Sequence, residues 1–161
     1  MLVGGLVLDK KKWVYSSVGV WLLASIGSGI SHTNPPVTHK VNWDNPQTQA
    51  LFSKVCMDCH SHETKWPWYS YIAPISFAIH HHVDEGRKHF NVSAGILDEA
   101  YEAAKEYEED KMPEGGYVYF HPEAQLTELE RSQLIAGLKA TFPGVHGHGH
   151  DHDHKHGNHH H

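Results

Sequence analysis

Apolar residues recur at steps of three and four along most of the chain, which is the pattern of amphipathic helices. The clearest stripe consists of Ile72, Ile75, Ile79, Val83, Gly86 and Phe90. A second stripe, with Ser93 as the expected N-cap, consists of Leu97, Ala100, Tyr101, Ala104 and Tyr107. A third consists of Leu134, Ile135, Leu138 and Phe142. The pattern predicts an all-α fold.

Helix-start signals predict one further helix and support the third stripe. Asn45 and Pro46 form an N-cap and first helical position, and the helix they open runs into Cys56 with Leu51, Phe52 and Val55 on one side. Thr127 and Glu130 have the spacing of a capping box, and Pro143-Gly144 ends the last helix.

Gly137 lies in the middle of that last helix. Glycine costs about 1 kcal/mol relative to alanine there, which is reasonable where another helix crosses closely. We expect the helix before Cys56 to be that partner.

The N-terminal segment, residues 1–31, has the features of a membrane anchor. Lys10, Lys11 and Lys12 precede an uncharged run at residues 13–30. Basic residues before an apolar segment favour an N-terminus inside the cell. The run would span about 27 Å as a helix, close to the ~30 Å hydrocarbon core. We expect an uncleaved anchor, with a cleaved signal peptide as the alternative because small residues end the run.

The remaining chain divides into three parts. Residues 32–44, with Asn34-Pro35-Pro36, are expected to form an extended linker, and residues 45–143 a helical domain. Residues 144–161 alternate histidine with glycine, aspartate and lysine, so we expect a disordered tail that binds Ni(II), Zn(II) or Cu(II) weakly. The final histidines could also be a purification tag.

Composition limits the partners. The 161 residues suffice for one domain plus appendages, and the formal net charge of −6 gives no basic footprint for nucleic acid. An acidic surface suits a basic redox partner.

The two cysteines of the chain occur in Cys56-Met57-Asp58-Cys59-His60, which is the attachment signature for c-type haem. Positions i and i+3 of a helical turn face the same way, so both thiols can reach one porphyrin edge. The adjacent His60 can then bind the iron as the proximal ligand. Attachment of this type takes place outside the cytoplasm in bacteria, so the motif also predicts an exported domain.

Three other uses of these residues fit the sequence less well. A zinc site needs a second ligand pair at suitable spacing, and the next histidines, His80 to His82, do not supply one. A thioredoxin-like redox pair needs a βαβ context, whereas the surroundings are helical. A disulfide would leave His60 unexplained.

Further residues are candidates for contact with the haem. Trp66, Trp68, Tyr69 and Tyr71 form a dense aromatic group after the motif, and we expect it to pack on the haem edge and to hydrogen-bond a propionate. Ordinary core packing is the alternative for each ring. Arg87, close to the α-helical stripe, could pair with a propionate or be a surface arginine.

Met112 is the best-placed methionine for the second axial position, because it lies in a loop that continues with Pro113 and two glycines. Met57 lies inside the motif and cannot fold over the distal face. His80, His82 and His121 are the alternative distal ligands; His81 is expected to face solvent.

Together these motifs resemble the bacterial haem-binding-domain family of small mono-haem c-type cytochromes. The matching residues are Cys56, Cys59, His60, Ser61, Thr64, Trp66-Pro67-Trp68-Tyr69, Ile72-Ala73-Pro74, Ser76, His82-Val83, Glu85-Gly86-Arg87, Asn91, Ser93, Met112-Pro113, Tyr117, His121-Pro122-Glu123-Ala124 and Leu126. The resemblance implies a class I cytochrome c-like fold with His60 and Met112 on the iron. His62, Phe77 and Glu114 depart from the family pattern.

The sequence therefore predicts a membrane-anchored mono-haem cytochrome c that transfers single electrons outside the cytoplasm, without substrate chemistry. Its expected partners are redox proteins, such as a membrane oxidoreductase. The alternatives are a haem peroxidase or gas or redox sensor with an open distal site, and a metal-handling protein that acts through the His-rich tail.

Overall fold

The computed structural model describes residues 10–26, 32–114 and 116–144. These ranges contain helices and turns but no strand, and one isolated antiparallel bridge joins Asn91 and Ile96. The prediction of an all-α fold is confirmed. The α-helices are α1 (Lys10–Ile26), α2 (Pro46–Val55), α3 (Met57–His60), α4 (Ile75–His89), α5 (Ala103–Glu108), α6 (Tyr117–Phe120) and α7 (Glu128–Thr141). Short 3₁₀ turns are η1 (Trp68–Tyr71), η2 (Ala100–Glu102) and η3 (Pro122–Ala124).

The expected membrane anchor corresponds to α1, which begins at Lys10 and ends at Ile26. In the described part of the chain, no helix has the length and apolar character needed to cross a membrane. The last four residues of the predicted apolar run, 27–30, lie outside the described residues, and so does the predicted disordered tail from residue 145.

The predicted crossing of the first and last helices of the domain is confirmed. Asn45 caps α2 by accepting the backbone N–H of Thr48 at 2.9 Å. Thr48 packs against Gly137 of α7 so closely that a Cβ at Gly137 would overlap its side chain. The glycine therefore allows the two helices to touch.

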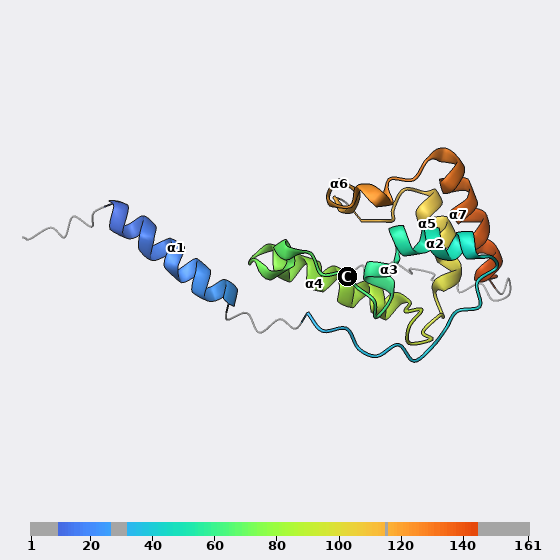
Figure 1. Cartoon of the computed structure of the whole chain (residues 1–161), viewed down its shortest axis with the longest axis horizontal. Coiled ribbons are helices and arrows are strands. Elements are labelled where there is room, and N and C mark those ends of the chain that lie inside the picture. The colour runs from blue at the N-terminus through green and yellow to red at the C-terminus, as the bar shows by residue number, and fades with distance from the viewer. Residues whose placement is uncertain (1–9, 27–31, 115, 145–161) are drawn as a thin grey trace, which may run out of the picture.

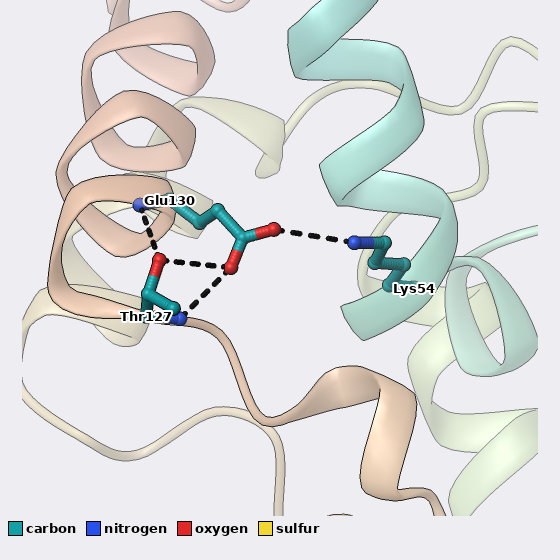
Figure 2. A network of polar contacts seen from close by, with 3 residues as sticks. All are labelled: Lys54, Thr127 and Glu130. Carbon is teal, nitrogen blue, oxygen red and sulfur yellow. Dashed lines mark hydrogen bonds and ion pairs between the residues drawn. The ribbon is translucent and has the colours of Figure 1, made fainter.

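The start of α7 carries the predicted capping box. Thr127 Oγ1 accepts the backbone N–H of Glu130, and the Glu130 carboxylate accepts the backbone N–H of Thr127 at 2.9 Å. Figure 2 shows the same carboxylate pairing with Lys54 of α2 at 3.3 Å. The cap thus also connects α7 to α2.

A single apolar core lies between α2, α5 and α7, which are grouped on one side of the molecule in Figure 1. Its buried members are Leu51, Phe52, Val55, Phe90, Val92, Ala100, Ala104, Tyr107, Ala124, Leu134, Leu138 and Phe142. Residues of the predicted helix before Cys56 and of the second and third stripes therefore meet in one core.

Residues 32–43 are extended, as predicted, and they lie against the helical domain; we call them the N-terminal strap (Figure 1). The backbone N–H groups of Thr38 and His39 both donate to Ser93 O at 2.9 Å. Trp43 packs on Phe52 and Phe142 with ring centroids 4.9 and 5.8 Å away. These contacts were not predicted.

The buried face of α4 differs from the predicted stripe at its start. Val83 and Gly86 are buried and His81 is exposed, as expected. Ile75, however, is 48% exposed, and Ser76 is buried instead. The prediction for Ile75 is wrong because α4 begins at that residue, where the chain turns from η1.

The helix predicted to start at Ser93 is also wrong. Asn91 Oδ1 accepts the backbone N–H groups of Ser93 and Ala94, which makes a turn instead of a helix start. Gly95 then has a φ of +74°, outside the helical region. Helical structure begins at Ala100, and Tyr101, predicted to be buried, is 51% exposed.

Candidate functional site

The Cys56–His60 motif forms one tight turn between α2 and α4. The backbone N–H groups of Cys59 and His60 both donate to Cys56 O, at 3.2 and 3.0 Å. Both cysteines are free and half-buried. The motif therefore presents two thiols and an imidazole from one hydrogen-bonded turn.

His60 is 8% exposed and held in one orientation. Its Nδ1 lies 3.2 Å from Phe90 O, and its ring stacks on the Phe90 ring with centroids 3.9 Å apart. Because a carbonyl only accepts, Nδ1 carries the proton and Nε2 keeps its lone pair. Burial lowers the pKa of His60, although the carbonyls of Phe90 and Gly86 oppose the shift. A neutral imidazole with a fixed Nδ1–H is the form that ligates a metal.

The two thiols are protonated at neutral pH. Burial raises the pKa of Cys56 to about 12, and the neighbouring Cys59 adds to the shift. Burial also raises the pKa of Cys59 to about 11, with the carboxylates of Asp58 and Glu114 adding to it. These thiols therefore do not have the character of the reactive thiolates found in redox or nucleophilic sites.

This donor set fits a haem better than a bare metal ion. The described residues hold no group of three or more His, Cys, Asp or Glu side chains able to bind a metal ion. A zinc site of the Cys₂His₂ type would need two further ligands beside Cys56 and Cys59. A haem brings four ring nitrogens of its own, so His60 can suffice on one face.

The end of α4 packs against the motif. Gly86 is buried against Cys59, and Val92 N–H donates to His60 O at 3.0 Å. Arg87, predicted as a propionate partner, donates through Nε to Ser61 O at 2.8 Å and through Nη2 to Thr64 Oγ1 at 2.9 Å. Nη2 also reaches Asn34 Oδ1 of the strap at 3.0 Å. Arg87 thus links the motif to the strap.

The four aromatics after the motif form two groups. Trp66 is half-buried and stacks on His80 at 4.5 Å. Trp66 and Tyr71 both pack on His32 of the strap, with ring centroids 5.1 and 3.7 Å away. Trp68 is 74% exposed and packs edge-on against Tyr69 at 5.7 Å. Tyr69 donates to or accepts from His121 Nε2 at 3.3 Å.

A polar chain that sequence reasoning missed runs from the motif to this aromatic group. Tyr117 donates its hydroxyl to Asp58 Oδ2 at 2.8 Å and stacks on His121 at 4.1 Å. His121 then meets Tyr69, and its Nδ1 lies 3.2 Å from Glu123 Oε1. Burial, followed by the charge of Asp58, raises the pKa of Tyr117. No local spacing signals these contacts, because the partners are far apart in sequence.

Met112 lies in the loop before α6, where it lines a pocket of about 270 Å³ with Tyr107, Pro113, Leu126 and Arg131. Cys56, Cys59 and His60 are not among the lining residues. The same loop reaches α4, because His82 Nδ1 lies 2.5 Å from Glu114 Oε2. Glu114 is also close enough to Cys59 and His60 to raise the pKa of each. The loop therefore lies near the motif through Glu114, while Met112 is one of the residues that line the pocket.

The alternative distal histidines differ in their contacts. His82 pairs with Glu114, and His121 stacks on Tyr117. His80 packs on Trp66, and among the described residues its buried Nε2 has no hydrogen-bond partner.

Comparison with known proteins gives one match. The family described as haem-binding domain matches residues 22–140 of the chain. No curated protein and no solved structure matches.

Proposed function

Because the chain belongs to the haem-binding domain family, we propose that it is a c-type cytochrome with its haem attached covalently through Cys56 and Cys59. The observation that carries this proposal is the turn at Cys56–His60. It offers two protonated thiols and a buried, neutral His60 whose Nδ1 proton is already donated to Phe90 O.

In this proposal the chain binds and tunes the haem, which when bound would supply a one-electron Fe(III)/Fe(II) couple. His60 is the proximal ligand and Met112 the distal one. Trp66, Trp68, Tyr69 and Arg87 are the proposed haem neighbours. The protein would act as an electron carrier, without substrate chemistry.

The proposed role of Met112 is supported by the position of its loop. Glu114, two residues on, pairs with His82 of α4 and acts electrostatically on Cys59 and His60.

We further propose that the haem domain lies on the outer face of a bacterial cytoplasmic membrane, with the N-terminal segment as anchor or as cleaved signal. Three lysines, Lys10 to Lys12, precede the apolar residues of this segment. A membrane oxidoreductase is the proposed type of redox partner.

The attachment is tested by denaturing electrophoresis and mass spectrometry of protein matured in a cytochrome c-producing host. We expect haem to remain with the wild-type chain after denaturation and to be lost from a Cys56→Ala/Cys59→Ala variant. Haem that dissociates from the denatured wild type would exclude c-type attachment.

A second candidate, a haem peroxidase or gas sensor with an open distal site, is favoured by the pocket that Met112 lines, because Cys56, Cys59 and His60 do not line it. Carbon monoxide separates the two. Reduced native protein with Met112 on the iron should bind it slowly or incompletely, and Met112→Ala should bind it fast. Fast and complete binding by both proteins would favour the open site.

A further inference from the structure

Gly86 lies in the last turn of α4, directly against the backbone of Cys59. A Cβ at this position would lie 2.8 Å from Cys59 O and 3.0 Å from Cys59 Cβ. The nearest atom belongs to the backbone and cannot swing aside as a side chain could. Any residue larger than glycine must therefore push α4 away from the motif.

The residue that holds His60 is fixed to the same turn. Phe90 is the C-cap of α4, with an extended backbone, and its N–H donates to Gly86 O at 3.1 Å, which fixes Phe90 relative to Gly86. Phe90 O in turn faces His60 Nδ1 at 3.2 Å, and its ring covers the imidazole. The carbonyl of Gly86 also acts on the His60 imidazole.

We propose that Gly86 is a positioning residue for the proximal ligand. By its missing side chain it sets the distance between the carbonyls of Gly86 and Phe90 and the Nδ1–H of His60. The inference rests on the haem attachment proposed above. A close carbonyl makes the imidazole a stronger donor through Nε2, which favours Fe(III) over Fe(II) and lowers the reduction potential.

The test is Gly86→Ala in the full-length, haem-loaded protein, with redox titration as the readout. We expect an upward shift of the midpoint potential, because the added methyl group separates α4 from Cys59 and weakens the bond to His60. The Nδ1–H of His60, followed by NMR in the reduced protein, should exchange with solvent faster than in wild type.

Gly137→Ala is the matched control. It also introduces a methyl group at a helix contact, but that contact is with Thr48, on α2, and not with the haem motif. This variant should be less stable than wild type and keep the wild-type potential. An unchanged potential in Gly86→Ala, or an equal shift in both variants, would overturn the inference.

If Gly86→Ala does not take up haem, hydrogen exchange in the wild type tests the inference instead. The wild-type His60 Nδ1–H should be protected from exchange; exchange as fast as that of an exposed histidine such as His81 would contradict the inference. Failure of the wild type itself to retain haem would instead reject the proposed function.

Discussion

At the scale of single residues, His80 lies in surroundings that disfavour its charged form. Its ring is stacked on Trp66, and among the described residues its buried Nε2 has no hydrogen-bond partner. Burial lowers the pKa of His80, nearby His32 and Arg87 lower it further, and Asp84 opposes them. The folded state therefore holds His80 neutral at a pH where the unfolded chain already binds a proton.

We therefore predict that His80 makes the protein less stable as the pH is lowered. Because the unfolded state binds more protons, the free energy of unfolding falls as the pH drops below the ordinary histidine pKa of about 6.5. In His80→Phe, which can still stack on Trp66, the slope between pH 7 and 5 should be smaller by at most about 1.4 kcal/mol per pH unit. Urea titrations at several pH values measure this slope. The control is His81→Phe, which changes an exposed histidine and should keep the wild-type slope. Equal slopes in all three proteins would refute the prediction.

Arg131 has several contacts with the end of α5. Its Nη2 donates to Tyr107 O at 2.8 Å and to Glu108 O at 3.1 Å, and it pairs with Asp110 at 2.7 Å. Its guanidinium lies 4.8 Å from the centre of the Tyr107 ring. It therefore satisfies carbonyls that a helix end leaves open.

We expect Arg131→Ala to lower the free energy of unfolding by about 2 kcal/mol, because half-buried carbonyls lose a charged donor. Lys139→Ala removes a partner of exposed Glu108, at 3.0 Å, and should change stability by no more than about 0.5 kcal/mol. Chemical denaturation of both variants gives the comparison. A similar small loss in both would show that the Arg131 contacts contribute little.

At the scale of helices, the crossing of α2 and α7 depends on the pair Thr48 and Gly137. Gly137→Ala should destabilise the domain by about 1–3 kcal/mol, because the methyl group overlaps the buried Thr48 side chain. Thr48→Ala removes the two nearest atoms, Oγ1 and Cγ2, so the same glycine substitution should cost less in that background. A double-mutant cycle measures this coupling. Additive losses would mean that the helices do not touch through this pair.

The elements that could be predicted are those with local signals. The caps at Asn45 and Thr127 and the contact glycine Gly137 placed α2 and α7 correctly. The segment after Ser93 was mistaken for a helix, because the apolar spacing was read without the turn that Asn91 makes.

The residues of the candidate site also divide into those with a local signal and those without one. Cys56, Cys59 and His60 could be predicted because they lie together in one short motif. The carbonyl of Phe90, the contact of Gly86 and the bonds of Arg87 depend on α4 returning to the motif, which no spacing reveals. The role of Met112 stays a prediction.

At the scale of the whole molecule, the strap joins parts of the domain that are distant in sequence (Figure 1). His32 Nε2 lies 2.8 Å from Ser70 O, Asn34 donates to Thr64 O at 2.9 Å, and His62 Nδ1 lies 2.9 Å from Pro36 O. Farther along, Trp43 packs on the aromatic core. The segment expected as a linker thus contacts η1, the loop after the motif and the core in turn.

Two truncated chains test where the folded unit begins. A chain of residues 32–144 should unfold at the same urea concentration as the full chain, because it keeps every strap contact. A chain of residues 45–144 should be less stable by roughly 3–5 kcal/mol, since loss of a packed aromatic side chain alone has that effect. Trp43→Ala in the full chain removes the aromatic packing but keeps the strap's hydrogen bonds. This substitution should account for most of the stability difference between the two truncated chains. Equal stability of the two truncated chains would mean that residues 32–44 are a linker after all.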